Sequence, residues 1–160
     1  MEKEDFLVAL GFKGFTARIK RLSDTLMYDA KHVYRYSGIA IAPNWHLVFL
    51  LLQDEKRLTV TEISKKLDLS HPAVIKITGK MREKGFLTGM PHETDSRKTY
   101  LQLTEKSRRY LPELQEQWDL ITTIIETLIN EEFLSKLGDL ENDLRNKSLL
   151  DRFKEKYDAQ

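Results

Sequence analysis

The cations of this sequence are concentrated in its middle. Residues 56–109 hold 13 Lys and Arg against 6 Asp and Glu, a net charge of +7, whereas the flanking residues hold 13 against 19, a net charge of −6. The whole chain of 160 residues has a formal net charge of only +1. A concentrated field of positive charge is typical of a surface that binds a polyanion, so the middle segment is expected to bind nucleic acid.

Two of these cations lie on one side of a short predicted helix that follows Ser70. Val74, Ile77 and Met81 recur at helical spacing and are expected to face the core. The exposed side then carries His71, Ala73, Ile75, Lys76 and Lys80. Lysine suits phosphates and guanine edges, and the two aliphatic side chains can contact thymine methyl groups. We interpret this segment as a DNA-reading helix with Ser70 and Pro72 in its first turn; an ordinary solvated helix is the alternative.

A second cluster of charge lies in a polar segment further along the chain. Arg97 is expected to sit on a thin hairpin, from which a guanidinium can reach the negative potential of a narrow minor groove. Asp95 itself repels DNA, so its expected role is to orient Arg97 through a charge-assisted hydrogen bond. Lys98 and His92 are expected to contact phosphate or solvent. The alternative is a loose surface ion pair, worth under about 1 kcal/mol.

The elements that must position these residues have their own signals. Thr59 and Glu62 have the spacing of a capping box, which predicts a helix over residues 60–67. Ser70 can cap the next helix, and Gly85 ends it where a left-handed residue is favoured. Two short helices joined by a tight turn are typical of a helix-turn-helix.

The periodicity becomes alternating after Gly85. Residues 86–88 and 99–103 are predicted to form a β-hairpin, or wing, with a long polar tip between them. Apolar spacings of three and four predict helices over residues 6–26, 104–128 and 131–157, the last with a break at 146–148. Pro43, which a first helical turn tolerates, predicts a further helix over residues 43–53. The helix over 43–53 is apolar nearly all round and is expected to be buried. The fold class is therefore mainly α with a small β-hairpin wing.

Residues 58–107 resemble the winged-helix core of the MarR (multiple antibiotic resistance regulator) family. The segment Asp95-x-Arg97-x-x-x-Leu101-x-Leu103-Thr104 has the spacing of the family's wing signature, while the flanking helices match in pattern and length. The resemblance implies a homodimeric repressor or activator whose terminal helices interleave across a two-fold axis. Gly79 departs from the polar residue usual in the family, and an interior glycine costs a helix about 1 kcal/mol relative to alanine.

The resemblance also implies an effector, commonly a small aromatic anion, bound where the dimer helices meet the winged helix. The candidate pocket residues lie around the junction of the first two predicted helices: Tyr28, His32, Trp45, His46 and Phe49. Packing in the core or the dimer interface is the favoured alternative, because aromatic residues gather at helical junctions without any ligand. No cysteine and no compact His/Glu cluster accompanies the histidines, so neither a metal nor a cofactor is expected.

Other classes of function have little support. The sequence has no Gly-rich phosphate loop, no nucleophile elbow and no HExxH motif, so an enzyme is not expected. With no Cys, thiol chemistry and disulfides are excluded. The N-terminal residues lack a signal-peptide pattern and no apolar run is long enough for a membrane span, so a cytoplasmic protein is expected.

We therefore expect a single domain over residues 1–160, with dimerisation helices at 1–36 and 105–160 and a winged helix-turn-helix at 43–104. The expected function is a homodimeric regulator that binds a pseudo-palindromic site in double-stranded DNA, with release by a small aromatic or anionic effector as a further expectation. The alternative is a winged-helix module that docks on a protein partner. Such a module does not need a concentrated field of cations, so the charge distribution favours DNA.

Overall fold

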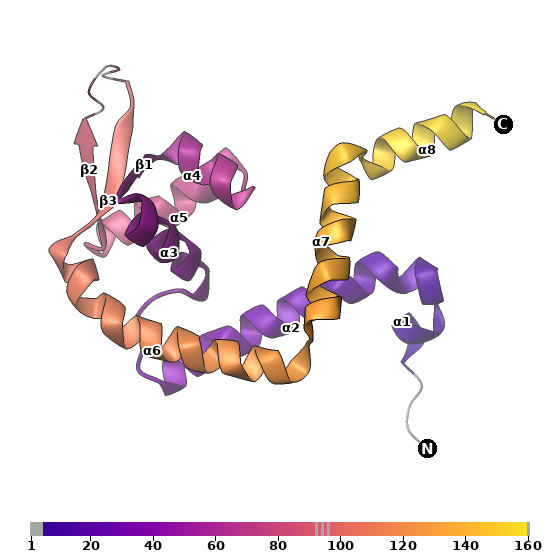
Figure 1. Cartoon of the computed structure of the whole chain (residues 1–160), viewed down its shortest axis with the longest axis horizontal. Helices are drawn as coiled ribbons and strands as arrows, with labels where there is room; N and C mark the ends of the chain where they lie inside the picture. The colour runs from indigo at the N-terminus through magenta and orange to yellow at the C-terminus, as the bar shows by residue number, and fades with distance from the viewer. Residues whose placement is uncertain (1–4, 92, 94, 96, 160) are drawn as a thin grey trace. The chain divides into compact units, whose positions relative to one another are not determined.

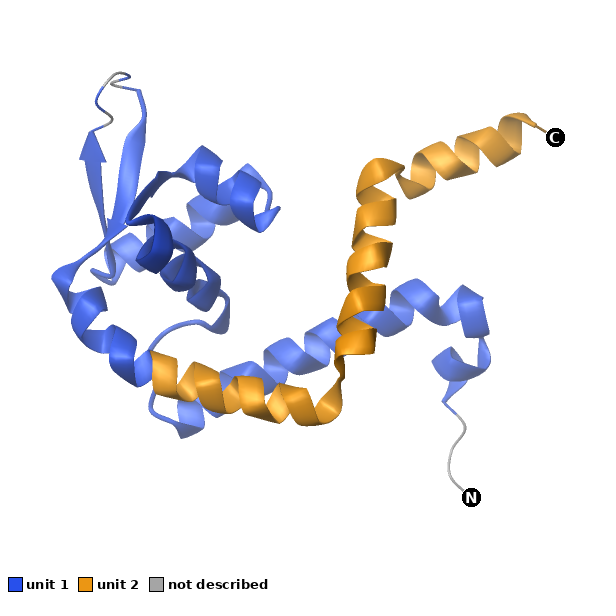
Figure 2. Cartoon of the chain, viewed as in Figure 1, with its two compact units in different colours: residues 1–114 blue, residues 115–160 orange. Residues whose placement is uncertain are grey.

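The computed structural model describes residues 5–91, 93, 95 and 97–159. Within these residues, eight α-helices, two short 3-10 turns and a three-stranded sheet follow one another along the chain (Figure 1). The chain forms two compact units, residues 1–114 and residues 115–160 (Figure 2). None of the described helices is long and apolar enough to cross a membrane.

The N-terminal helix expected over residues 6–26 is broken, so that prediction was wrong. Helix α1 (Phe6–Ala9) is followed by a 3-10 turn (Gly11–Gly14) and then by α2 (Phe15–Tyr36). Gly11 has a φ of +55°, a left-handed conformation that ends α1 although the apolar spacing continues beyond it. Arg21 on α2 donates to the carboxylate of Asp5 over 2.7 Å, which ties the start of α1 to α2.

The sequence prediction agrees better with the structure over residues 38–55. Gly38, with a φ of +73°, follows the end of α2, and a 3-10 turn (Pro43–Trp45) leads into α3 (His46–Glu55). Burial of α3 all round was nevertheless a wrong expectation. Val48, Phe49 and Leu52 are buried, whereas Leu47 and Leu50 on the same helix are exposed.

The helix-turn-helix consists of α4 (Val60–Leu67) and α5 (His71–Glu83). The expected capping box is present, because the Thr59 side chain accepts from the backbone N–H of Glu62 and the Glu62 carboxylate accepts from the backbone N–H of Thr59. Asp68 adopts the left-handed conformation in the tight connection, with a φ of +50°. Gly85, with a φ of +74°, lies just beyond the end of α5, as predicted.

The sheet contains one strand that was not predicted. Strand β1 (Arg57–Thr59) pairs antiparallel with β3 (Thr99–Leu103), which also pairs with β2 (Leu87–Pro91), so the order is β1-β3-β2. Three residues are too few to show alternation in a sequence. Strand β2 also runs to Pro91, so residues 89–91 belong to the hairpin and not to its tip.

The core of the winged helix is aromatic at its centre. Phe86, at the end of the helix-turn-helix, makes edge-on contacts with Trp45 and Phe49, with ring centroids 5.8 and 5.6 Å apart. Val74 and Met81 of α5 are fully buried within the same unit. Because α5 contributes one whole face to this core, its opposite face is fixed as a surface.

The C-terminal helices match the sequence expectation. Helix α6 (Glu105–Leu128) begins where the Thr104 hydroxyl accepts from the backbone N–H of Ser107, and its residues are divided between the two units after Leu114. Helix α7 (Glu131–Asn146) and helix α8 (Leu149–Asp158) are separated at the predicted break. Ser148 caps α8 by accepting from the backbone N–H of Asp151.

Candidate nucleic-acid interface

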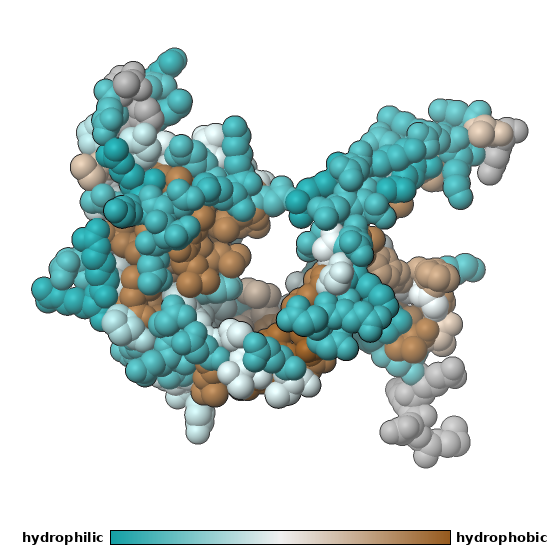
Figure 3. Space-filling model, in the orientation of Figure 1, coloured by the Kyte–Doolittle hydropathy of each residue, from teal (hydrophilic) through white to brown (hydrophobic). Residues whose placement is uncertain are grey.

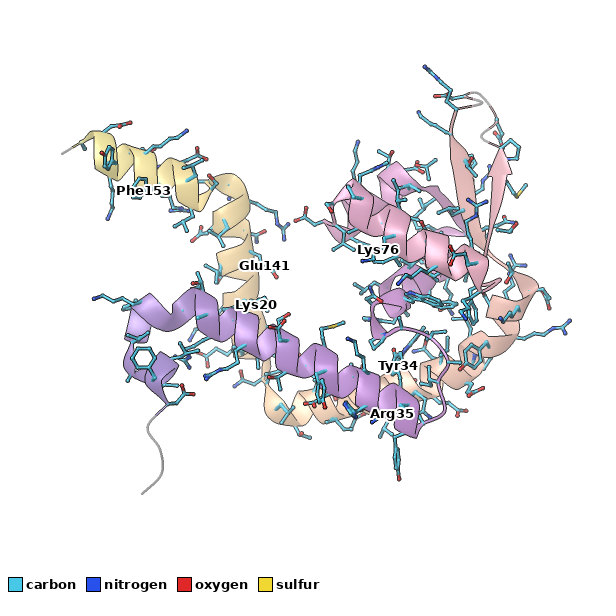
Figure 4. All side chains as sticks on the ribbon, turned by 180° about the vertical axis from the view of Figure 1, so that it is seen from behind. Lys20, Tyr34, Arg35, Lys76, Glu141 and Phe153 are labelled. Carbon is cyan, nitrogen blue, oxygen red and sulfur yellow. The ribbon has the colours of Figure 1, made fainter. Side chains whose placement is uncertain are left out.

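Helix α5 presents a basic, open face. Val74, Ile77 and Met81 are buried as the spacing predicts, which leaves Lys76 and Lys80 exposed on the other side. Figure 4 labels Lys76 on α5, which lies at the front of that view with no other ribbon drawn over it. Among the remaining candidates on α5, His71, Pro72 and Ile75 are exposed and Ala73 is half-buried.

The first turn of α5 is joined to the first turn of α4. Ser70 accepts from the backbone N–H of Ala73 over 3.4 Å, as a helix cap does. The ring Nε2 of His71 lies 3.4 Å from the hydroxyl of Thr61, a residue near the start of α4. Thr61 was not among the candidate residues. Only the fold brings it beside His71, because the two residues are ten positions apart in the sequence.

The wing tip contains the expected pairing of Asp95 with Arg97. Asp95 Oδ1 accepts from the backbone N–H of Arg97 over 3.1 Å and from its guanidinium Nε over 3.3 Å. The ammonium of Lys98 lies 3.6 Å from the other carboxylate oxygen. The Arg97 side chain is 91% exposed, so its guanidinium can still reach a ligand outside the chain. His92, expected nearby, lies outside the described residues.

These contacts stabilise the charged form of the Asp95 carboxylate. The backbone hydrogen bond from Arg97 contributes most to lowering its pKa below the usual 3.8, followed by the Arg97 side chain and Lys98, while partial desolvation acts in the opposite direction. The carboxylate is therefore ionised at neutral pH. It can hold Arg97 in one orientation without removing that side chain from solvent.

A further cation beside the wing, Arg57, was not identified from the sequence. Its guanidinium lies 4.8 Å from the ring centroid of Tyr100 and donates to Glu93 over 2.9 Å. The side chain therefore reaches from β1 across β3 to the residue beyond β2. No sequence signal pointed to Arg57, because β1 itself was not predicted.

The five candidate effector residues have different environments. Trp45 and Phe49 are buried against Phe86, as the packing alternative predicts. The His46 ring Nδ1 lies 2.7 Å from the carbonyl oxygen of Pro43. Tyr28 is exposed on α2 and its ring packs against that of His32, with centroids 4.3 Å apart.

A cleft of about 850 Å³ in residues 1–114 has a different lining. It lies among the segment after α2, the α5–β2 turn and the first turns of α6, and is lined by Gly38, Ala40, Lys84, Phe86, Glu105, Lys106, Arg109, Tyr110 and Glu113. Three cations and two carboxylates line it together. Lys106 donates to the carbonyl of Lys84, and Arg109 donates to Glu105. None of the five candidate effector residues lines this cleft.

A metal site has no basis in the part of the chain that the structure describes. No group of three or more His, Cys, Asp and Glu side chains there is arranged to hold an ion.

The geometry defines a winged helix-turn-helix with an exposed basic face on α5 and an exposed guanidinium on its wing. Residues 41–98 match the sequence profile of the MarR family. The match covers both helices of the helix-turn-helix and strand β2, so this part of the chain is similar to the MarR family. No curated protein sequence matches the chain.

Solved structures of regulators share the fold. Reduced AbfR bound to DNA is 19% identical, with a TM-score of 0.70 over 91% of this chain and 98% of that one. The PcaV transcriptional regulator from Streptomyces coelicolor, solved with its natural ligand, is 14% identical, with a TM-score of 0.64 over 92% and 99%. Overoxidized AbfR bound to DNA is 17% identical, with a TM-score of 0.68 over 84% and 92%. These identities are low, so the likeness is one of fold.

Proposed function

We propose that this chain is a homodimeric transcriptional regulator that binds a pseudo-palindromic site in double-stranded DNA. The observation that carries the proposal is the combination of an open basic face on α5 with a wing on which Asp95 orients an exposed Arg97. The family match over residues 41–98 supports the same function. Two neighbours in fold, both AbfR structures, were solved on DNA.

The proposed contacts divide into two groups. Helix α5 enters the major groove with its N-terminal half, where Ser70, His71, Pro72, Ala73, Ile75 and Lys76 face the DNA and Lys80 follows one turn later. The wing places Arg97 in the minor groove, with Lys98 on phosphate and Asp95 holding the tip. Phosphate contacts supply most of the affinity, and base edges supply the discrimination.

The proposed dimer rests on apolar side chains that a monomer leaves in water. In residues 1–36 these include Phe6, Phe15, Ile19, Leu22 and Leu26, all exposed. In residues 115–160 they include Leu128, Leu144, Leu149, Leu150 and Phe153. Figure 3 shows apolar surface on the helices outside the winged helix. Monomeric proteins rarely expose so many large apolar side chains on their helices, so a second copy of this chain is the proposed cover.

The proposal includes control by a small aromatic or anionic effector. The PcaV structure, which shares the fold, contains a natural ligand, and this supports the proposal of a ligand for the present chain. The Tyr28 and His32 pair on α2 remains the candidate region, because Trp45 and Phe49 serve the core. A regulator of this kind acts where the DNA is, in the cytoplasm expected from the sequence.

A binding titration against duplex DNA at several salt concentrations tests the function. Wild-type chain is expected to bind with a strong salt dependence, because each phosphate contact releases counterions. Arg97→Ala should weaken binding and reduce the salt slope by about one unit. Lys76→Ala should in addition blur sequence preference, by roughly 1 to 3 kcal/mol at the base it contacts. Unchanged binding by both variants would refute this docking arrangement.

A further inference from the structure

The open face of α5 consists of two rows with different chemistry. Helical spacing aligns Ala73, Lys76 and Lys80 in one row, and Pro72, Ile75 and Gly79 in the adjacent row. The first row ends in two ammonium groups. The second row has no charge and no side-chain hydrogen-bond donor, so it cannot recognise guanine or adenine edges as lysine or glutamine does.

Ile75 is the prominent side chain of the uncharged row. It is 52% exposed, whereas Val74 and Ile77 of the same helix are buried. A methyl group placed on Gly79 would meet nothing within 4 Å, so the helix surface one turn beyond Ile75 is bare. Single exposed aliphatic residues are ordinary on protein surfaces. Ile75 differs because it lies beside Lys76 on the face proposed to enter the major groove.

Two polar neighbours of Ile75 have other partners. Thr78 is buried, and its hydroxyl donates to the carbonyl of Val74 over 2.8 Å. The His71 ring lies against the Thr61 hydroxyl of α4. The aliphatic side chain of Ile75 is therefore, together with the neighbouring Lys76, available to a base edge.

We propose that Ile75 is a specificity-determining residue that contacts the C5 methyl group of a pyrimidine, thymine in ordinary DNA, in each half-site. The C5 methyl is the apolar group that a base pair offers in the major groove, and an aliphatic side chain gains affinity by burying it. The absence of a side chain at Gly79 lets the helix approach the base closely. This inference rests on the proposed function, because it needs α5 in the major groove.

The expected size of the effect follows from the area buried. Burying one methyl group is worth about 0.8 kcal/mol, which corresponds to roughly a fourfold change in affinity for each methyl removed. Lys76 gains its affinity from charge and hydrogen bonds, so it contributes nothing to discrimination between a methylated and an unmethylated pyrimidine.

The experiment uses the duplex that the wild-type chain selects from a random-sequence library. Each thymine is first replaced by uracil, one at a time, to find the position at which the methyl group matters. Four duplexes are then compared there: thymine or uracil opposite adenine, and 5-methylcytosine or cytosine opposite guanine. Wild-type chain is expected to prefer the methylated base about fourfold in both pairs. Preference in the thymine pair alone would still assign the contact to the C5 methyl group, because thymine and uracil differ in nothing else, but it would contradict its extension to 5-methylcytosine.

Variants of α5 separate this inference from the proposed function. Ile75→Ala should bind methylated and unmethylated duplexes equally, and Ile75→Val should keep most of the preference. Lys76→Ala, the matched control on the same turn, should weaken all four duplexes and keep the ratio. The inference fails while the proposed function stands in either of two outcomes. In the first, wild-type chain selects a duplex, but replacing any of its thymines by uracil leaves the affinity unchanged. In the second, Ile75→Ala keeps the wild-type ratio of affinities for methylated and unmethylated duplexes. If wild-type chain binds no DNA, the proposed function fails as well.

Discussion

At the scale of single residues, Asp95 places an acidic group on a surface proposed to meet phosphates. The contacts of Asp95 explain why an acidic residue lies there. Its carboxylate accepts two hydrogen bonds from Arg97 and lies near Lys98, so it holds two cations together at the wing tip. Aspartate at this position is therefore explained by the orientation of Arg97. The pairing could be predicted from the sequence, since the two residues are only two positions apart.

We expect Asp95→Ala to weaken DNA binding severalfold even though it removes a negative charge. Removal of the charge alone would strengthen binding to a polyanion, so a loss of affinity isolates the orienting role. Fluorescence anisotropy with the selected duplex measures the effect. Glu93→Gln is the matched control, because Glu93 accepts from Arg57 and its removal should leave affinity equal or higher. Tighter binding by Asp95→Ala would contradict the orienting role.

The ordering of the wing tip should also depend on pH in one direction. The pKa of Asp95 lies below its usual 3.8, so the tip contacts are complete above that value and are lost as the pH falls through the lowered pKa. An NMR titration of the Arg97 amide should therefore show no transition between pH 7 and about 4 and a transition below it. A midpoint above 3.8 would contradict the assigned hydrogen bonds.

Lys56 stores strain at the end of α3. Its φ of 61° and ψ of −49° lie in a region that residues with a side chain rarely occupy. Such strain destabilises the folded state by about 1 to 3 kcal/mol. Glycine removes the strain, but its greater loss of chain entropy on folding destabilises the folded state by roughly 0.5 to 1 kcal/mol. Lys56→Gly is therefore expected to raise the free energy of unfolding by about 1 kcal/mol in urea titrations. Lys65→Gly, within α4, should lower it by a similar amount.

At the scale of elements, the helix caps and the break at residues 146–148 could be predicted from the sequence, whereas the break at Gly11 and strand β1 could not. Thr59 with Glu62, Ser70 and Gly85 fixed the ends of α4 and α5 because each acts on backbone groups within a few residues. The break at Gly11 was missed because apolar side chains on both sides keep the spacing of one helix. Strand β1 forms by pairing with β3, which is more than forty residues away in the sequence. No local sequence pattern therefore predicts it.

At Gly79, the stability of α5 and its proposed binding to DNA favour different residues. A Cβ there would meet nothing within 4 Å, so Gly79→Ala should stabilise α5 and raise the free energy of unfolding by about 1 kcal/mol. The same methyl group would stand between α5 and the proposed groove, so DNA affinity should fall. Gly138→Ala on α7, measured at a protein concentration that saturates the proposed dimer, is the matched control, because that position is equally open. It should give the same stabilisation with unchanged DNA affinity; equal affinity for both variants would remove Gly79 from the interface.

At the scale of the whole molecule, charge and apolar surface are separated along the chain. The cations lie in residues 56–109, while the exposed large apolar side chains are most frequent on α1, α2, α7 and α8. Net charge of a segment and apolar content of a helix are sums over many residues, so the sequence predicted both. Which apolar side chains a partner covers depends on side-chain packing across an interface, and the sequence contains no periodic signal for that.

A second copy of the chain is expected to cover the exposed apolar side chains of α8, and the energetics can be tested there. Phe153 and Tyr157 stack with ring centroids 5.6 Å apart while both remain exposed, and Leu149 and Leu150 precede them on the same helix. Burying one such side chain fully stabilises an assembly by roughly 1.5 to 3 kcal/mol. Removing residues 146–160 should therefore weaken the dimer by several orders of magnitude, and Phe153→Ser by about tenfold to a hundredfold.

Sedimentation equilibrium at micromolar concentration measures the dimer, and DNA binding follows it by linkage, because two joined winged helices bind two half-sites at once. Lys154→Ser changes the adjacent exposed residue and should leave both the dimer and its DNA affinity unchanged. Phe153→Ser should lower DNA affinity at low protein concentration and recover it at high concentration, where mass action restores the dimer. A wild-type chain that sediments as a monomer, or a truncated chain that binds DNA as tightly as the full one, would show that the apolar helices serve another partner.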